Sequence, residues 1–287
     1  MKRYRPSGNR FPDGFSIHNK TILVYLSEIG IKLKNMKKIF STILLVLAFS
    51  LNALAQTEYS VCLYDSLRSR VIPVAVYSPA RTNRHTGVVV FSHGYHKNKD
   101  PQSHRRYAYL NRYLAENGYY VISIHHERPD DPQMPLTGGN FAVTRRSNWE
   151  RGKENVMFTI NAFKALKPDL DWKKLILIGH SNGGDISMLC IDENPQLFYK
   201  GITLDSRRMR MPRTASPRLY TLRGCDYEAD EGALPTEKEQ KQYRMTVVKL
   251  DGVTHSDMGR RGTHEKHEIV KQWVYKFVKE RRFAETR

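Results

Sequence analysis

The sequence predicts an α/β fold in which helices cover both faces of a mostly parallel central sheet. Strand-like and helix-like segments alternate from residue 59 to near the C-terminus, as they do in such folds. Residues 87–92 (GVVVFS) form an uninterrupted apolar run, which is typical of a parallel strand buried on both faces. A glycine-rich turn at 179–184 joins a second apolar run to a helix. Together these features predict a single α/β domain over residues 56–287.

The individual elements follow from the spacing of apolar residues. Residues 61–64 and 71–77 are expected to form the two strands of an N-terminal hairpin. A helix is expected over 103–117, because apolar residues recur there at helical spacing and Gly118 provides a stop. The later elements are expected in this order: strand 119–124, loop 127–147, helix 148–166, strand 175–178, helix 182–193, strands 201–204 and 219–222, helix 237–243, strand 245–250 and a closing helix around 269–277.

Composition limits the class of protein. The chain has 287 residues, of which 40% are hydrophobic and 26% charged, the balance of a globular protein rather than a disordered or multi-span membrane one. Three cysteines are too few for a disulfide scaffold. Against 29 Asp and Glu, the 47 Lys and Arg give a formal charge of +18, which raises the question of a nucleic-acid or anionic-surface partner.

Residues 36–55 (MKKIFSTILLVLAFSLNALA) have the three parts of a secretory signal peptide. Two lysines follow Met36, an apolar run comes next, and Ala-Leu-Ala at 53–55 supplies a small-x-small cleavage site. The sequence therefore predicts a secreted or periplasmic protein with no stable membrane anchor after cleavage; an uncleaved anchor is the alternative. Residues 1–35 precede the expected start and are interpreted as a mis-called extension, with a translated extension as the alternative.

Part of the positive charge lies in this N-terminal region. Residues 1–55 hold nine of the basic and two of the acidic residues, which leaves 38 basic and 27 acidic residues, a balance of +11, in residues 56–287. The sequence contains no nucleic-acid recognition motif, and export would keep the protein away from nucleic acid. We therefore expect no nucleic-acid partner.

The strongest chemical signal is the pentapeptide GHSNG at 179–183. It lies between the apolar run 175–178 and a helix, the strand–turn–helix context of a G-x-S-x-G nucleophile elbow. Glycines are needed there because side chains would clash within the tight turn. The turn would lift the Ser181 hydroxyl above the strand ends, beside helix N–H groups that favour negative charge. The sequence thus predicts Ser181 as a nucleophile; a helix-capping serine is the alternative.

Acyl transfer through a serine also needs two hydrogen-bond donors for the oxyanion. One would be the N–H of Asn182, the residue after the nucleophile. The other is expected from the loop that follows strand 87–92, where the segment FSHGY places the N–H of Tyr95. Tyr95 and Asn182 are therefore the predicted oxyanion hole.

A general base and a carboxylate must follow the nucleophile along the chain in this arrangement. His255 is the one histidine after Ser181 that directly follows an expected strand. Asp226 is the preferred acid, because it follows the penultimate expected strand. Asp205, at the end of the strand before it, is the first alternative, and Asp230 is the second. Each of these aspartates could instead form a turn.

With these motifs the chain resembles the α/β-hydrolase family over residues 59–281. FSHGY, LAENGY and GHSNGG are similar to dienelactone-hydrolase-like esterases, and with GITLD the same stretches resemble platelet-activating-factor acetylhydrolases. The resemblance implies a serine nucleophile at Ser181, a histidine base at His255 and no cofactor. The first branch takes its acid from the loop of Asp226 and the second from the position of Asp205, so the resemblance leaves both open.

The surroundings of the site are expected to be open. About a dozen residues, 206–218, separate two expected strands after Asp205, too few for a helical lid, so we expect no large cap domain. Arg207 and Arg208 lie in this segment and are candidate contacts for an anionic group of the substrate. A solvated charge run is the alternative.

The leading functional hypothesis is a serine hydrolase that cleaves carboxylic esters of small-molecule or lipid-like substrates through an acyl-enzyme on Ser181. A peptidase or thioesterase with the same residues is an alternative. A basic, non-catalytic binding module for anionic lipid or polysaccharide is another, and its basic residues would form one patch away from the cleft. No metal or other cofactor is expected, and the oligomeric state is left open.

Overall fold

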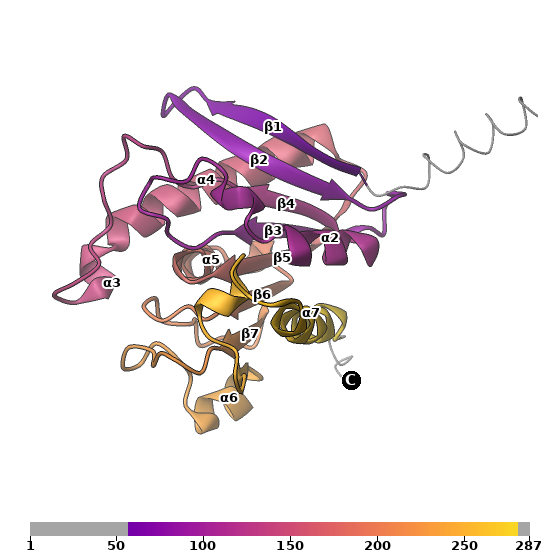
Figure 1. The fold of residues 1–287 in the computed structure, drawn as a ribbon. Helices are drawn as coiled ribbons and strands as arrows, with labels where there is room; N and C mark the ends of the chain where they lie inside the picture. Colours follow the sequence, from indigo (N-terminus) through magenta and orange to yellow (C-terminus); the bar gives the residue numbers. More distant parts are fainter. Residues whose placement is uncertain (1–56, 281–287) are drawn as a thin grey trace, which may run out of the picture. The chain divides into compact units, whose positions relative to one another are not determined.

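The computed structural model describes residues 57–280; the expected extension and signal peptide lie outside this range. The described part contains an eight-stranded sheet in the order β1-β2-β4-β3-β5-β6-β7-β8 (Figure 1). Along the chain the strands are β1 (Thr57–Asp65), β2 (Arg70–Ser78), β3 (Gly87–Ser92), β4 (Tyr120–Ile124), β5 (Asp171–His180), β6 (Lys200–Leu204), β7 (Arg218–Arg223) and β8 (Thr246–Lys249).

The expected N-terminal hairpin is present at one edge of the sheet. β1 and β2 pair antiparallel over their full length, from Thr57 opposite Ser78 to Asp65 opposite Arg70. β2 also pairs antiparallel with β4, and the remaining pairings are parallel. The carboxyl ends of the parallel strands therefore meet at one edge of the sheet, where α/β sheets place their ligands.

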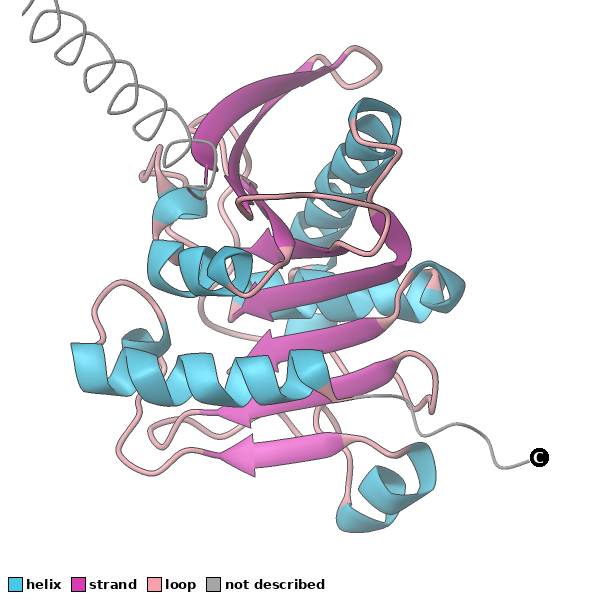
Figure 2. Cartoon of the chain, turned by 90° about the vertical axis from the view of Figure 1, so that its right-hand side faces the viewer, coloured by secondary structure: helices cyan, strands magenta, loops and turns pink. Residues whose placement is uncertain are grey.

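Helices cover both faces of the sheet, as the sequence predicts (Figure 2). The helices α2 (Ala108–Glu116) and α7 (His264–Lys279) lie on one face, and α4 (Arg146–Leu166) and α5 (Asn182–Glu193) lie on the other (Figure 1). The shorter helices of the described part are α3 (Phe141–Thr144), α6 (Glu237–Tyr243), η1 (Ser103–Arg105), η2 (Pro195–Leu197) and η3 (Ser256–Met258). No helix within residues 57–280 has the length and apolar character needed to cross a membrane.

Each face of the sheet has its own apolar core, because side chains alternate along the strands. In β3, Val88 and Val90 belong to a cluster with side chains of α4 and α5, whereas Val89 and Phe91 belong to a cluster with side chains of α2 and α7. All four are fully buried. This double burial is why β3 is continuously apolar, and it confirms the predicted fold class.

Two segments predicted as loops can now be compared with the structure. The stretch expected as a loop at 127–147 contains α3 and the start of α4. Helix α3 forms there because Asn140 Oδ1 accepts the Ala142 N–H at 3.0 Å and caps the helix. Residues 206–217, between β6 and β7, contain neither helix nor strand. The carboxyl edge of the sheet carries no helical domain from this segment.

Candidate active site

Ser181 lies on the turn between β5 and α5. Its backbone has a φ of 53° and a ψ of −123°, a conformation that is costly for a residue with a side chain. Leu204 O accepts the Ser181 N–H at 2.9 Å, and the Ser181 carbonyl accepts the N–H groups of Gly184 at 2.9 Å and Asp185 at 3.1 Å. These bonds anchor the strained turn, which has the geometry of a nucleophile elbow.

Three glycines make this turn possible through close packing. A Cβ on Gly179 would lie 2.2 Å from the carbonyl oxygen of Gly183, and a Cβ on Gly183 would lie 2.2 Å from that of Ser92. A Cβ on Gly184 would lie 2.7 Å from Ser206 Cβ. Backbone atoms cannot move aside in a close-packed interior, so the glycines are required for helix α5 to approach the strand ends.

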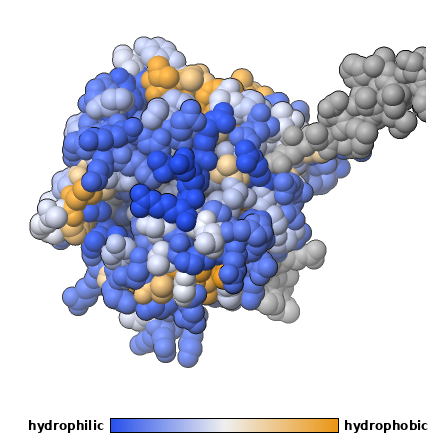
Figure 3. Space-filling view, viewed as in Figure 1, coloured by the Kyte–Doolittle hydropathy of each residue, from blue (hydrophilic) through white to orange (hydrophobic). Residues whose placement is uncertain are grey.

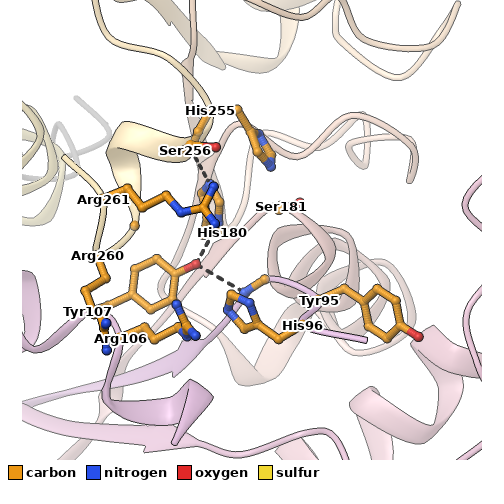
Figure 4. Close-up of a pocket in the computed structure, with 12 residues that line it drawn as sticks. Tyr95, His96, Arg106, Tyr107, His180, Ser181, His255, Ser256, Arg260 and Arg261 are labelled. Carbon is orange, nitrogen blue, oxygen red and sulfur yellow. Dashed lines mark hydrogen bonds between the residues drawn. The ribbon is translucent and has the colours of Figure 1, made fainter. Parts of the chain in front are cut away.

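His255 pairs with Asp205. Its Nδ1 lies 2.6 Å from Asp205 Oδ2, the distance of a strong charge-assisted hydrogen bond. Because an ionised carboxylate only accepts, Nδ1 carries the proton, and Nε2 of a neutral ring is then the basic nitrogen. Ser181 and His255 line the same cavity (Figure 4). The site thus brings a serine on a strained elbow together with an oriented imidazole.

Asp205 is fully buried and has further partners. Its Oδ1 accepts the Gly224 N–H at 2.9 Å and lies 2.8 Å from Arg223 Nη1. Burial by itself would raise the pKa of Asp205, but the hydrogen bond from His255, the Arg223 charge and the Gly224 N–H outweigh it and hold the pKa below its usual value. The carboxylate is therefore ionised near neutral pH and can stabilise an imidazolium at His255.

Asp226, the acid preferred from the sequence, does not contact the imidazole. Its Oδ1 instead accepts the backbone N–H of His255 at 2.7 Å, and its side chain is exposed. The physical reason is depth in the sheet: Asp205 follows β6 immediately, whereas Asp226 lies three residues beyond the end of β7. The ring therefore pairs with the first alternative, the position that the resemblance to platelet-activating-factor acetylhydrolases implies. Asp230, the second alternative, forms an ion pair with Arg208.

The expected oxyanion donors lie next to Ser181. Asn182 begins α5 directly after it, and Tyr95 lines the same cavity. The loop of Tyr95 approaches closely, because a Cβ on Gly94 would lie 3.3 Å from Ser181 Cβ. Within residues 57–280, no acceptor bonds to the N–H of Tyr95 or Asn182. The Asn182 side chain is fixed by Trp149, whose Nε1 donates to its Oδ1 at 3.0 Å. Both N–H groups are thus available to a ligand.

Glu127 holds the loop that carries Tyr95. Its buried carboxylate accepts the N–H of His96 at 2.7 and 3.0 Å and the N–H of Asn98 at 2.7 Å. Lys97 and Asn98 have φ values of 59° and 58°, and this left-handed turn directs the N–H groups of His96 and Asn98 at the carboxylate. Burial raises the pKa of Glu127 to about 7 against the opposing effect of these two N–H groups. No local sequence pattern predicts this role of Glu127.

His180 links the elbow to both neighbouring loops. Its Nε2 donates to the His255 carbonyl at 3.0 Å, and its Nδ1 accepts from the Tyr107 hydroxyl at 2.7 Å (Figure 4). The same hydroxyl accepts the Gly94 N–H at 3.3 Å. Burial, and then the charge of His255, lower the pKa of His180 to about 3. His180 is therefore neutral and can accept and donate in this chain at the same time.

Arg207 and Arg208, the predicted substrate contacts, do not line the Ser181 cavity. The guanidinium of Arg207 lies 4.1 Å from the centre of the Tyr227 ring, and that of Arg208 lies 4.4 Å from the centre of the Phe141 ring. The chain after β6 is drawn toward α5, because Asp185 Oδ1 accepts the Arg208 N–H at 3.1 Å. The two arginines therefore lie outside this cavity, and their contact with substrate stays a prediction.

Three other arginines line the Ser181 cavity. The cavity has a volume of about 270 Å³ and is lined by Arg106, Arg260 and Arg261 together with Ser181 and His255 (Figure 4). Figure 3 looks onto the carboxyl edge of the sheet, where strongly hydrophilic side chains gather at the centre of the face. The positive charge suspected from the sequence is therefore present at the site itself.

Several residues of the site were not predicted from the sequence. Arg260 and Arg261 form an adjacent pair five and six residues after His255, a signal that the sequence did contain. Arg223 directly precedes Gly224 at the end of a strand, but its role depends on which acid pairs with His255. Tyr107 had no local signal, because its partner lies 73 residues later in the chain.

A cluster of four buried histidines and one half-buried histidine lies beside the site without forming a metal centre. His96 is the half-buried member, and the buried members are His93, His104, His125 and His126. Burial lowers the pKa of each, to about 4 for His96 and His104 and to about 3 for His126. Within residues 57–280, no group of three or more His, Cys, Asp or Glu side chains is arranged to hold a metal ion. The cluster therefore consists of neutral packed rings near neutral pH.

Comparison with known proteins identifies the fold. No protein-family model and no curated protein matches the sequence. Among solved structures, an esterase from Rhizomucor miehei matches with a TM-score of 0.57 at 12% identity, over 78% of this chain and 82% of that one. A dienelactone hydrolase-like promiscuous phosphotriesterase from metagenomic libraries matches with a TM-score of 0.56 at 15% identity, over 78% of this chain and 98% of that one.

A structure without a lid is among the matches. This α/β serine hydrolase from Xanthomonas campestris has a TM-score of 0.53 at 12% identity, over 78% of this chain and 97% of that one. The chain also matches two longer chains named for peptidases, of which it spans 36% and 43%. The structural neighbours are thus α/β serine hydrolases, and the chain has the α/β-hydrolase fold.

Proposed function

We propose that the protein is a serine hydrolase that cleaves carboxylic esters through an acyl-enzyme on Ser181. The observation that carries the proposal is the 2.6 Å hydrogen bond between His255 Nδ1 and Asp205 Oδ2, in a cavity that also contains Ser181 on its strained turn. The presence of an esterase among the structural neighbours supports the same chemistry.

In the proposed reaction, Ser181 Oγ attacks the ester carbonyl while His255 Nε2 takes its proton. Asp205 keeps the ring oriented and stabilises the imidazolium. The N–H groups of Tyr95 and Asn182 bind the oxyanion of the tetrahedral intermediate. His255 then gives the proton to the leaving alcohol, and an acyl-enzyme remains. Water, activated by His255 in the same way, releases the acid and restores Ser181.

The substrate is proposed to be a small-molecule or lipid-like ester. A peptidase or thioesterase would use the same residues and remains the alternative within this reaction class. The non-catalytic binding module predicts basic residues gathered away from the cleft. Instead, Arg106, Arg260 and Arg261 line the cavity of Ser181, which favours the enzyme.

We further propose that the protein is exported, with cleavage between Ala55 and Gln56. The proposal predicts that protein isolated from the periplasm or the medium begins at Gln56, which intact-mass measurement detects. Recovery of the protein only in the cytoplasm, with residues 36–55 still attached, would contradict it.

A fluorophosphonate probe tests the proposed nucleophile. The wild-type protein is expected to gain the mass of one probe, and Ser181→Ala is expected to gain none. Ser256 is a matched control, because it is the other serine that lines the cavity, and Ser256→Ala is expected to be labelled like wild type. Equal labelling of Ser181→Ala, or no labelling of the folded wild type, would refute the proposal.

A further inference from the structure

The lining of the Ser181 cavity is cationic and lacks acidic side chains. Its three guanidinium groups belong to Arg106, Arg260 and Arg261, and no Asp or Glu lines the cavity. Arg106 forms an ion pair with Asp100 and is therefore partly neutralised. Arg260 and Arg261 are exposed, and neither forms an ion pair within residues 57–280. The positive charges of Arg260 and Arg261 thus have no ion-pair partner among residues 57–280.

Two acids near this loop are engaged elsewhere. Asp257 lies 2.6 Å from Lys266 Nζ and accepts the Thr254 hydroxyl at 2.7 Å. Asp205 is bonded to the His255 ring and to Arg223. Neither carboxylate therefore forms an ion pair with Arg260 or Arg261.

Two histidines of the cavity add no positive charge near neutral pH. Burial lowers the pKa of His96 to about 4, with the Arg106 charge as the next cause, and lowers that of His180 to about 3. Both rings are therefore neutral near pH 7. The charge of the lining thus comes from the guanidinium groups, which attract anions.

We propose that this site takes esters that carry a carboxylate or phosphate group, and that Arg260 and Arg261 bind this group. The inference rests on the proposed function, because it names the substrate class of the Ser181 site. The planar guanidinium fork matches the oxygens of both anions. Both side chains are exposed, so solvent screens the interaction, and we expect a preference of about tenfold rather than an absolute requirement.

Two pairs of esters test the proposal, and the members of each pair differ by one charge. The anionic 4-acetoxybenzoate and the neutral methyl 4-acetoxybenzoate place the charge on the alcohol side, and monomethyl and dimethyl adipate place it on the acyl side. 4-Acetoxyphenyl phosphate distinguishes phosphate from carboxylate. For each pair, we expect Arg260→Ala/Arg261→Ala to lower kcat/KM for the anionic ester about tenfold and to leave that for the neutral ester nearly unchanged. A tenfold change in one pair is enough to support the proposal.

Two further variants separate local binding from general electrostatics. Lys238→Ala/Lys241→Ala removes the same charge from exposed positions of α6. For this variant we expect the ratio of kcat/KM between the anionic and the neutral ester of each pair to stay at its wild-type value. Arg260→Lys/Arg261→Lys keeps the charge but loses the fork, and it is expected to recover part of the preference. An equal fall in the lysine-to-alanine control would mean long-range attraction and would overturn the assignment.

The result also distinguishes this inference from the proposed function. Hydrolysis of the neutral esters that depends on Ser181, with ratios unchanged in Arg260→Ala/Arg261→Ala, would overturn the anion site and leave the hydrolase intact. If wild type hydrolyses none of the esters, calorimetry with benzoate and benzyl alcohol on Ser181→Ala decides the anion site. Binding of benzoate but not of benzyl alcohol, lost when Arg260→Ala/Arg261→Ala is added to Ser181→Ala, supports the anion site. Absence of benzoate binding to Ser181→Ala overturns it.

Discussion

The ends of β6 and β7 each deliver a carboxylate to His255, but the two contacts differ in kind. Asp205, at the end of β6, is fully buried and bonds to the imidazole at 2.6 Å. Asp226, beyond the end of β7, is exposed and bonds to the backbone N–H of the same residue at 2.7 Å. Asp205 can stabilise a positive charge on the ring, whereas Asp226 can only hold the backbone of the loop in place. Proximity to His255 therefore does not by itself identify the acid that orients its ring.

The largest expected effect follows from removing the charge at the ring. Asp205→Asn keeps the shape of the side chain but offers the ring no anion, and its amide can impose the wrong tautomer. We expect kcat for a neutral ester to fall by about 10³–10⁴ with little change in KM. Steady-state kinetics on folded protein measure this, and a loss below tenfold would contradict the assignment.

A smaller effect is expected from the residue behind Asp205. Arg223 Nη1 lies 2.8 Å from Asp205 Oδ1 and also donates to Ser206 O at 2.6 Å. Arg223→Met leaves that carboxylate oxygen with only the Gly224 N–H, so the pKa of Asp205 should rise. We expect kcat to fall about tenfold, because the ionised form of Asp205 loses the support of the Arg223 charge. An unchanged kcat would show that Arg223 does not support the acid.

The smallest kinetic effect is expected at the second acid. Asp226→Asn can still accept the His255 N–H through its amide oxygen, so we expect kcat within about twofold of wild type. Asp226→Ala removes the acceptor of the His255 N–H at an exposed site. The lost hydrogen bond should contribute about 1 kcal/mol to the activation free energy and so lower kcat by about fivefold. A loss of 10³-fold in Asp226→Asn would reverse the roles of the two acids.

The predictability of these features depends on how local they are. The elbow at Ser181 is formed by consecutive residues in a strand–turn–helix pattern, so the sequence is sufficient to predict it. The choice between Asp205 and Asp226 depends on how many residues separate each aspartate from the end of the preceding strand. The pattern of apolar residues does not determine where each strand ends. The strands and the longer helices were predictable in order from apolar periodicity, because both faces of the sheet are covered, whereas the short helix α3 was not, since none of its side chains is buried.

The arginines show the same limit. Arg207 and Arg208 follow a site strand, but the path of their segment is set by Asp185, which lies on α5 and bonds to the Arg208 N–H. Arg260 and Arg261 follow His255 closely and do reach the cavity. Distance along the chain from a catalytic residue is a usable signal only when no distant contact redirects the segment.

The buried acid should also affect stability at low pH. The pKa of Asp205 is lowered in the folded protein, so the unfolded chain binds this proton more tightly. Its contribution to stability is complete above the unfolded pKa of about 3.9 and is lost as the pH falls through the lower folded value. Asp205→Asn should therefore weaken the loss of stability between pH 5 and pH 3 relative to wild type. Urea unfolding at these two pH values measures the free energy of unfolding, and an equal loss in wild type and Asp205→Asn would contradict the prediction.

The central claim is that Asp205 holds the proton-bearing Nδ1 of His255. Proton NMR at low temperature tests it without any substrate, because a short hydrogen bond between imidazole and carboxylate shifts its proton far downfield. The account predicts one such resonance in wild type that persists in Asp226→Asn and disappears in both Asp205→Asn and His255→Ala. A resonance that survives in Asp205→Asn, or that disappears in Asp226→Asn, would contradict it.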